Sequence, residues 1–348
     1  MRFCGRYAVA AWLGLAVLTT GHASAEDAPP SQQFADLGSC ETMSGTPIAD
    51  CRIGFRTAGT LNKDRSNAVL VPTWFRGTSE GHLFLASSKA IDSSKLFIIF
   101  ADAIGNGVSI SPSNSTVQPE GEFPQLRIVD MVDAQYRLVT EQFGIKKLYG
   151  IVGISMGGMQ AFEWGVRYSD FTDRIVTIVG SPQLPAFDIL RWRARNQLIA
   201  MARDCQCSEP LEISSVVSMM SDPPELVSKK VSREEALGTP PPPSPLDIRS
   251  SWDGQRQAEA MMYHDIARDM DGNLAAAAEA IVADVLVIVA MDDRVVTPHP
   301  AMKFAELDGA KTVILKSGCG HGAFRCESQT MNNALNAFLA SDKRPSGD

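Results

Sequence analysis

Short apolar runs recur along the chain, and amphipathic segments separate most of them. Runs of this kind predict buried strands, which we place at 51–57, 68–72, 96–101, 148–153, 174–180, 285–290 and 312–316. Segments between them follow a helical period, at 129–143, 156–168, 300–307 and 328–340. Because strands and helices alternate, the sequence predicts an α/β fold with a mostly parallel sheet and helices on both of its faces.

The pattern changes in the middle of the chain, where helical periodicity replaces the alternation. Helices are predicted there at 188–203, 212–220, 252–270 and 274–281. A proline-rich stretch at 239–245 interrupts them as a stiff loop, because proline fixes φ and lacks an N–H. We therefore expect a core built from residues 26–182 and 284–342, with residues 183–283 inserted as a helical lid. Residues 343–348 should form a disordered tail.

Residues 1–25 do not fit this fold pattern and resemble a secretory signal peptide. Arg2 and Arg6 give a positive start, an apolar run covers 7–19, and Ala23-Ser24-Ala25 is a small-residue cleavage site. The run is short for a transmembrane helix, and no cysteine follows it to accept a lipid. We predict a protein exported to the periplasm or secreted, free of the membrane after cleavage. An uncleaved membrane anchor is the alternative.

A candidate nucleophile follows the apolar run at 148–154. The run enters the turn Gly153-Ile154-Ser155-Met156-Gly157, and a predicted helix begins directly after the serine. A strand that reverses into a helix within a few residues forces the central residue into a strained turn, and flanking glycines avoid a clash there. The Ser155 hydroxyl then stands exposed at a helix N-terminus. The alternative is a glycine-rich turn with an inert serine.

Candidate partners of Ser155 follow it in chain order. Asp292 and Asp293 come directly after the predicted strand at 285–290, at the strand end where functional groups gather in parallel sheets. We choose Asp293 and keep Asp292 as its competitor. His321 lies in a glycine-rich loop after the last predicted strand. A neutral imidazole there would take the serine proton during attack, while the aspartate holds its tautomer.

Cysteine usage agrees with export, because six cysteines remain beyond the signal-peptide-like segment and fall in local pairs. Six cysteines allow 15 connectivities, so the pairing stays open. A Cys319–Cys326 bond would bracket His321 and pin its loop, and a Cys40–Cys51 bond would tie an early hairpin. Cys205 and Cys207 are too close in sequence to bond each other without strain, so we expect them to be free.

Four stretches of the chain carry a family resemblance: Phe123-Pro124 with Asp130-Met131-Val132-Asp133-Ala134-Gln135, the segment from Gly153 to Trp164, Asp293-Arg294, and Gly320-His321-Gly322-Ala323-Phe324. Together they resemble the homoserine O-acetyltransferase branch of the α/β-hydrolase superfamily. The similarity is almost continuous over 67–185 and resumes at about 285–338. The resemblance implies an α/β-hydrolase fold with a triad of Ser155, Asp293 and His321.

The resemblance also implies residues around the nucleophile. One oxyanion-hole amide would belong to Met156, and the second to the loop after an early strand, where Phe75 matches best and Trp74 lies one residue off. Trp74 and Arg195 are the candidate substrate-binding residues. Arg195 either binds a carboxylate or lies on a solvated basic helix face. The sequence departs from the family pattern at 204–207, which leaves the acceptor open. A homodimer is a further expectation from the resemblance.

Composition limits the partners. The chain has 348 residues, a hydrophobic content of 45% and a net charge of −8, enough for one large core plus a cap. The negative charge argues against nucleic acid or an anionic membrane as partner. No histidine pair shows metal-ligand spacing, and His264 is expected on the solvated face of a polar helix. We therefore expect neither a metal nor a cofactor.

Export shapes the predicted chemistry. Little acetyl-CoA should be available outside the cytoplasm, whereas a serine-bound acyl group collapses to water wherever the site is wet. We predict an exported esterase or related acyl hydrolase that acts on a small-molecule ester. Transfer of an acetyl group to homoserine or another alcohol is the alternative. A non-catalytic binding module on the same fold is the third reading.

Overall fold

The computed structural model describes residues 29–238 and 247–341. The chain divides into two units, residues 1–31 and residues 32–348, and all helices and strands of the described residues belong to the second. The predicted signal peptide, the proline-rich stretch at 239–245 and the tail at 343–348 lie outside the described residues.

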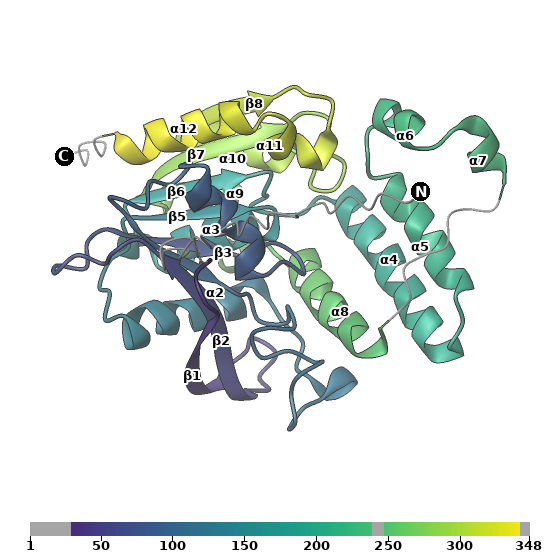
Figure 1. The fold of residues 1–348 in the computed structure, drawn as a ribbon, viewed down its shortest axis with the longest axis horizontal. Helices are drawn as coiled ribbons and strands as arrows, with labels where there is room; N and C mark the ends of the chain where they lie inside the picture. The colour runs from purple at the N-terminus through teal and green to yellow at the C-terminus, as the bar shows by residue number, and fades with distance from the viewer. Residues whose placement is uncertain (1–28, 239–246, 342–348) are drawn as a thin grey trace, which may run out of the picture. The chain divides into compact units, whose positions relative to one another are not determined.

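The second unit is built on a sheet of eight strands (Figure 1). In chain order they are β1 (Gln33–Cys40), β2 (Ile48–Ala58), β3 (Ala68–Pro72), β4 (Phe97–Ala101), β5 (Gly150–Ile154), β6 (Arg174–Ile178), β7 (Asp284–Ala290) and β8 (Lys311–Leu315). Their spatial order is β1-β2-β4-β3-β5-β6-β7-β8. The pairs from β4 to β8 are parallel, whereas β1 with β2 and β2 with β4 are antiparallel. The prediction of a mostly parallel sheet is confirmed.

Helices cover both faces of this sheet. They are α1 (Phe84–Ser87), α2 (Ile128–Arg137), α3 (Met156–Arg167), α4 (Ala186–Cys205), α5 (Glu209–Met219), α6 (Pro224–Lys230), α7 (Arg233–Leu237), α8 (Ile248–Met262), α9 (Leu274–Glu279), α10 (His299–Asp308), α11 (Ala323–Cys326) and α12 (Ser328–Ala340). One apolar cluster joins the sheet to α2, α3, α9 and α10, and a second joins it to α1, α11 and α12. Helices on both faces are therefore confirmed.

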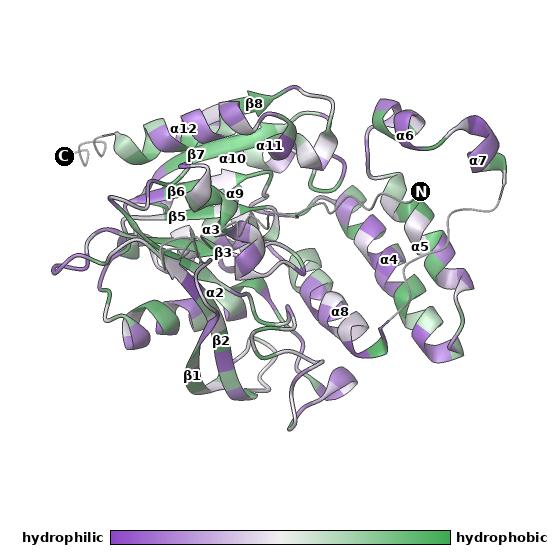
Figure 2. Ribbon diagram, in the orientation of Figure 1, coloured by the Kyte–Doolittle hydropathy of each residue, from purple (hydrophilic) through white to green (hydrophobic). Residues whose placement is uncertain are grey.

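Strand periodicity explains the two clusters. Val285, Val287 and Val289 of β7 belong to the first cluster, whereas Leu286 and Ile288 belong to the second. Successive side chains point to opposite faces, so a strand covered by helices on both sides must be apolar at every position. Figure 2 shows β7 as an almost continuous hydrophobic ribbon, in contrast to the mixed colouring of α4 to α7.

The helices and strands differ from the prediction in several places. Helix α8 ends at Met262 and not at residue 270, because the chain then turns to pair Asp265 with Gln183 in an isolated bridge. The short helices α6 and α7 were not predicted, since they bury no side chain and so lack an apolar stripe. Strand β1 was also missed, since its buried positions do not alternate regularly.

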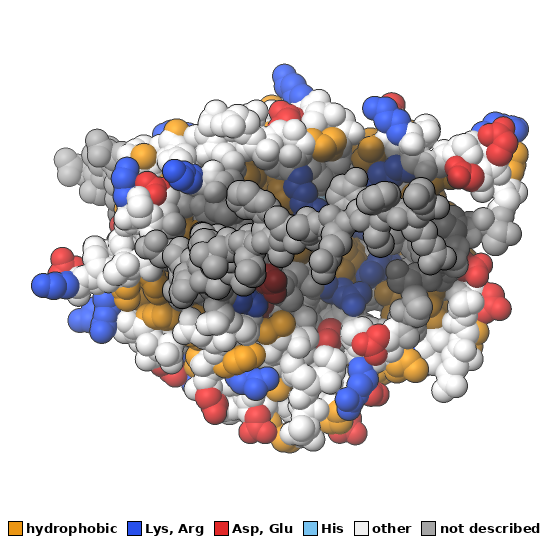
Figure 3. Space-filling model, viewed as in Figure 1, with side chains coloured by type: hydrophobic (Ala, Val, Ile, Leu, Met, Phe, Trp, Pro, Cys, Tyr) orange, Lys and Arg blue, Asp and Glu red, His pale blue; other side chains and the backbone are white. Residues whose placement is uncertain are grey.

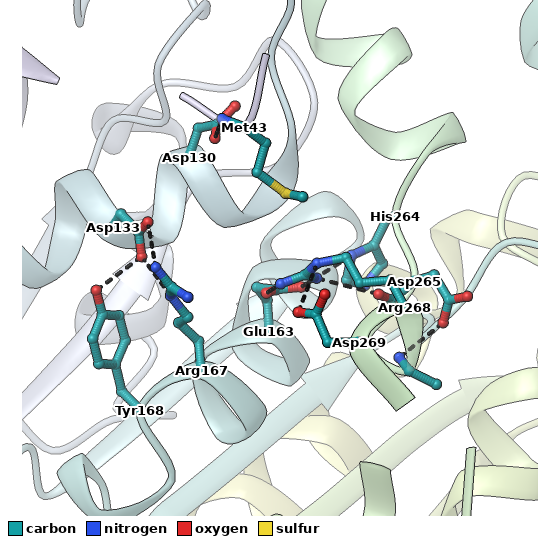
Figure 4. A network of polar contacts seen from close by, with 11 residues as sticks. Met43, Asp130, Asp133, Glu163, Arg167, Tyr168, His264, Asp265, Arg268 and Asp269 are labelled. Carbon is teal, nitrogen blue, oxygen red and sulfur yellow. Dashed lines mark hydrogen bonds and ion pairs between the residues drawn. The ribbon is translucent and has the colours of Figure 1, made fainter. Parts of the chain in front are cut away.

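The prediction that His264 lies on a solvated helix face was wrong. Its side chain is buried after the end of α8, with Nδ1 3.7 Å from Oε2 of Glu163 (Figure 4). Burial lowers the pKa of His264 to about 3, so the imidazole is neutral. Arg268 makes two hydrogen bonds of 2.7 Å to the Glu163 carboxylate. This buried cluster fastens the chain after α8 to helix α3.

The structure contains disulfides Cys40–Cys51 and Cys319–Cys326, with Cα–Cα distances of 5.6 and 6.6 Å. The expectation that Cys205 and Cys207 are free was wrong, because they also form a disulfide, with a Cα–Cα distance of 5.2 Å. Helix α4 ends at Cys205, and Gln206 adopts a left-handed conformation with φ 52°. The chain reverses there, which brings the two cysteines within normal bonding range.

Candidate active site

Ser155 lies between the end of β5 and the first residue of α3, with φ 57° and ψ −121°. A positive φ is strained for a serine and is typical of a functional turn. A Cβ at position 153 would lie 2.0 Å from the carbonyl oxygen of Gly157. A Cβ at position 157 would lie 2.5 Å from the carbonyl oxygen of Pro72. Both glycines are therefore required by the close approach of backbone, as the motif predicts.

The structure brings Ser155, His321 and Asp293 together in one hydrogen-bonded row. His321 Nε2 lies 2.9 Å from Ser155 Oγ, and His321 Nδ1 lies 2.7 Å from Asp293 Oδ2. The second oxygen of Asp293 accepts hydrogen bonds from the backbone N–H groups of Val295 and Val296. A carboxylate held in this way would favour the tautomer in which His321 Nε2 can accept the serine proton.

Asp292 has a different hydrogen-bond partner from Asp293. Its Oδ2 accepts a hydrogen bond of 3.1 Å from the N–H of Gly320, at the start of the histidine loop. No hydrogen bond or ion pair joins Asp292 to the His321 ring among the described residues. The geometry therefore supports the choice of Asp293 and leaves Asp292 as a brace for the loop.

The three residues all follow the carboxyl ends of parallel strands of the sheet. Ser155 follows β5, Asp293 follows β7 and His321 follows β8, each at the carboxyl end of its strand. Parallel strands place their carboxyl ends at one edge, which is where sites form in open α/β sheets. The Cys319–Cys326 disulfide closes the loop that carries His321.

The two backbone amides predicted for the oxyanion hole belong to Phe75 and Met156. In the loop after β3, the N–H of Trp74 donates to His82 Nε2 at 3.3 Å, and the N–H of Arg76 donates to Gln257 Oε1 at 2.7 Å. The N–H of Phe75 between them donates to no acceptor among the described residues. Met156 is the first residue of α3, whose N–H has no partner within the helix. The N–H groups of Phe75 and Met156 thus stay candidates for the oxyanion hole.

His82 and Gln257 were not predicted to hold this loop. His82 is fully buried and packs against Trp74 in a tilted arrangement, with ring centroids 3.7 Å apart. Burial lowers its pKa to about 4, so the ring is neutral and Nε2 can accept from Trp74 while Nδ1 donates to the carbonyl oxygen of Thr78. The position of His82 after the loop was a weak signal in the sequence, and Gln257 had none.

A buried row of side chains connects the same loop to α3. Trp164 Nε1 donates to Gln135 Oε1 at 2.9 Å, and Gln135 Nε2 donates to Gln160 Oε1 at 2.6 Å. Gln160 Nε2 then donates to the carbonyl oxygens of Thr73 and Met156. Two of the sequence stretches that carry the family resemblance meet here. Their glutamines hold both predicted oxyanion segments against each other.

Ser155 and His321 open into a cavity of about 300 Å³. Its walls are mainly aromatic and apolar, with Trp74, Phe75, Trp192, Val295 and Phe324. Trp74, predicted to contact substrate, therefore lies in the wall. A cavity of this volume is at the small end of ligand sites, which suits a short acyl group.

Arg195 lies behind this wall and not in it. Its guanidinium carbon is 5.4 Å from the Phe75 ring centroid and 5.5 Å from that of Trp192. Burial, followed by the charges of Arg76 and Arg191, lowers the pKa of Arg195 to about 10. Its Nη1 has no hydrogen-bond partner among the described residues. Arg195 is thus only partly exposed, which does not match a fully solvated helix face.

The described residues contain no cluster of three or more His, Cys, Asp or Glu side chains that could hold a metal ion.

The sequence matches the family model of the α/β-hydrolase fold over residues 69–325. This match covers most of the chain, and the parallel sheet with its strand–serine–helix turn agrees with it. The chain belongs to the α/β-hydrolase fold family, as its sequence predicts.

Several curated proteins are similar to this chain. A Corynebacterium glutamicum protein named as a probable esterase is 40% identical over 171 residues, which cover 48% of this chain and 49% of that protein. The ethyl acetate hydrolase of Pseudomonas veronii is 40% identical over 161 residues, which cover 45% of this chain and 46% of that protein. The homoserine O-acetyltransferase of Methanosalsum zhilinae is 32% identical over 168 residues, which cover 42% of this chain and 34% of that protein. The matched region thus spans about half of these relatives or less, and the predicted resemblance to homoserine O-acetyltransferases is confirmed.

Solved structures are similar over a larger part of the chain. An acetylester hydrolase from Corynebacterium glutamicum has a TM-score of 0.78 and 28% identity, covering 89% of this chain and 96% of that one. The acetyl esterase MekB has a TM-score of 0.77 and 29% identity, with the same coverage. The similarity therefore includes the helical segment between β6 and β7.

Proposed function

We propose that this protein is a serine ester hydrolase for short acyl esters. The observation that carries the proposal is the hydrogen-bonded row from Asp293 through His321 to Ser155, which opens into a small apolar cavity. The names of the similar proteins, an ethyl acetate hydrolase and two acetyl ester hydrolases, support short acyl groups.

The reaction follows from these positions. Ser155 Oγ attacks the ester carbonyl carbon while His321 Nε2 takes its proton, and Asp293 stabilises the imidazolium. The carbonyl oxygen becomes an oxyanion that accepts hydrogen bonds from the N–H groups of Met156 and Phe75. Collapse breaks the bond to the alcohol oxygen, which takes the proton from His321. Water, deprotonated by His321, then attacks the acyl-serine and releases the acid.

Acyl transfer is the second candidate function. The guanidinium of Arg195, with an unpartnered Nη1, supports it, because this group lies behind Phe75 and Trp192 and would bind the carboxylate of an amino-acid acceptor that displaces these side chains. The similar homoserine O-acetyltransferases support the same reading. The acyl-serine would then pass its acyl group to the acceptor hydroxyl in place of water.

One experiment separates these functions. Protein comprising residues 26–348 is incubated with 4-nitrophenyl acetate, with and without homoserine, and the products are followed by mass spectrometry for wild type and Ser155→Ala. Ser155-dependent release of acetate alone supports the hydrolase. Acetylhomoserine as the main product makes the protein a transferase. Activity that survives Ser155→Ala contradicts both.

We also propose export to an oxidising compartment and a lid role for residues 183–283. The three disulfides support export, since such bonds persist in oxidising surroundings. Among the described residues, no helix is both long and apolar enough to cross a membrane. Trp192 of α4 in the cavity wall supports the lid role. Detection of the protein lacking residues 1–25 in a periplasmic or culture fraction tests export.

A homodimer is the proposed assembly. Helices α4 and α5 and the residue after α5 carry exposed apolar side chains, namely Phe187, Leu190, Ile213, Val216 and Met220. An apolar surface of this kind is typical of a contact with another chain. Light scattering after size exclusion tests the proposal, and a monomer mass at micromolar concentration contradicts it.

A further inference from the structure

We propose that Arg325 recognises a negatively charged group on the alcohol part of the ester. This inference rests on the proposed ester hydrolase and specifies its substrate class, namely acyl esters of alcohols that carry a carboxylate. The observation behind it is a single cationic side chain in an otherwise apolar and aromatic cavity wall.

Arg325 is held at the cavity by aromatic rings. It lies in the short helix α11, and its guanidinium carbon is 5.4 Å from the Trp74 ring centroid and 5.1 Å from that of Phe324. Aromatic faces attract a guanidinium and restrict its orientation without using its N–H donors. Arg325 is exposed, and its donors are therefore left for water or for a ligand.

No acidic side chain neutralises this charge. Among residues 29–238 and 247–341, Arg325 has no ion pair and no hydrogen bond to a carboxylate, and no Asp or Glu lines the cavity. The whole chain carries a net charge of −8, so a positive cavity wall is a local feature and not a general property of the surface. Figure 3 shows Lys and Arg side chains interspersed with Asp and Glu side chains over the face in view. An anionic group is the natural partner for such a guanidinium.

The position of Arg325 assigns the charge to the alcohol part. His321 Nε2 must give its proton to the leaving oxygen, so the alcohol has to lie against the loop of His321. Arg325 follows His321 in the same loop, and the Cys319–Cys326 disulfide encloses both. A carboxylate on the alcohol can thus reach Arg325 while the leaving oxygen stays at His321. Guanidinium and carboxylate match in shape, since both are planar and can form two parallel hydrogen bonds.

The test uses two acetyl esters of equal size and different charge. 3-Acetoxybenzoate carries a carboxylate at pH 7.5, and 3-acetoxybenzamide is its neutral counterpart. Values of kcat/KM are measured at low salt for wild type, Arg325→Gln and Arg325→Lys. Arg193→Gln is the matched control, because Arg193 is an exposed arginine of α4 that lines a different cavity. Both esters are also measured at 0.5 M NaCl.

We expect wild type and Arg193→Gln to prefer the anionic ester by about tenfold or more. Arg325→Gln should remove this preference by lowering kcat/KM for the anionic ester more than for the neutral ester, and Arg325→Lys should keep part of it. High salt should reduce the preference of wild type, because exposed charges are screened.

Equal turnover of the two esters by wild type, or a preference that survives Arg325→Gln, overturns the role of Arg325 and leaves the proposed hydrolase intact. A charge preference of wild type for 4-nitrophenyl succinate over 4-nitrophenyl acetate that disappears in Arg325→Gln places the anion on the acyl part and overturns the assignment. Failure of wild type to cleave any of these esters overturns the proposed function and the inference with it.

Discussion

The side-chain oxygen of Gln257 accepts a hydrogen bond of 2.7 Å from the backbone N–H of Arg76. Gln257 belongs to α8, and its Nε2 also donates to the carbonyl oxygen of Ile104. Helix α8 therefore holds the loop that carries Phe75, one of the two proposed oxyanion amides. This part of the inserted segment is fixed to the core, and it orients the loop of the proposed oxyanion amide.

Replacing Gln257 with alanine should slow catalysis. The loop would lose the bond that fixes the Arg76 peptide, so the Phe75 N–H would meet the oxyanion less often. Removal of a whole oxyanion donor lowers kcat by about 10²–10³, and we expect a smaller loss of about tenfold here with little change in KM. Gln255→Ala, on the same helix but away from the loop, is the control. Equal kcat values for the two variants would contradict this role of Gln257.

The two neighbouring aspartates should differ in kinetic effect. Asp293→Asn removes the acceptor of His321 Nδ1 and should lower kcat by about 10³–10⁴, because the imidazole loses its favoured tautomer. Asp292→Asn keeps an oxygen for the Gly320 N–H and should lower kcat by less than about tenfold. Steady-state hydrolysis of 4-nitrophenyl acetate measures both. The reverse ranking would make Asp292 the catalytic acid.

Loss of the Cys319–Cys326 disulfide should lower kcat under conditions in which the protein stays folded. Without this bond, the loop of His321 is free to leave Ser155, which lowers the fraction of correctly placed imidazole. A Cys319→Ser/Cys326→Ser double variant should lose about tenfold in kcat at a temperature where circular dichroism shows it folded. The matched control is Cys40→Ser/Cys51→Ser, which opens a hairpin remote from the site. Strong reductant should slow wild type in the same way, and unchanged turnover would rule out the role.

The buried pair of Glu163 and Arg268 should matter to stability. Arg268→Met leaves a carboxylate buried beside His264. We expect the free energy of unfolding, measured in urea at pH 8, to fall by about 3–5 kcal/mol. Burial already raises the pKa of Glu163, so the uncompensated charge is costly. The double variant Glu163→Gln/Arg268→Met should recover much of the loss.

The control for this pair is Arg167→Met. Arg167 bonds to Asp133 on the exposed side of the same network, with 47% of its side chain accessible (Figure 4). Exposed ion pairs contribute about 0–1 kcal/mol, so this variant should unfold within about 1 kcal/mol of wild type. A loss as large as that of Arg268→Met would mean that burial does not set the cost.

His82 should make stability depend on pH. Its folded pKa of about 4 lies below the ordinary value of 6.5, so the unfolded chain binds an extra proton between these values. The free energy of unfolding should therefore rise with pH across that window, by up to about 3 kcal/mol from this group. Urea unfolding at pH 4.5 and 7.5 should show a smaller rise for His82→Gln than for wild type. An equal rise in the two proteins would contradict a buried neutral imidazole.

Local patterns in the sequence determined the main strands, the turn at Ser155 and the chain order of the predicted triad. Strands β3 to β7 follow from apolar runs, because a strand covered on both faces is largely hydrophobic. The turn at Ser155 follows from its two glycines, since covalent geometry leaves no room for a Cβ at either position. The chain order of Ser155, Asp293 and His321 also required no knowledge of distant contacts.

Tertiary structure alone decided the rest. The choice between Asp292 and Asp293 depends on where the loop of His321 folds, and both residues suit the same sequence pattern. Burial of His264 depends on a turn that ends α8 early. Gln257 and Arg76 are 181 residues apart, so no local period or spacing connects them. Backbone periodicity is a short-range property, whereas hydrogen bonds that position a catalytic loop form only after the sheet and helices have packed.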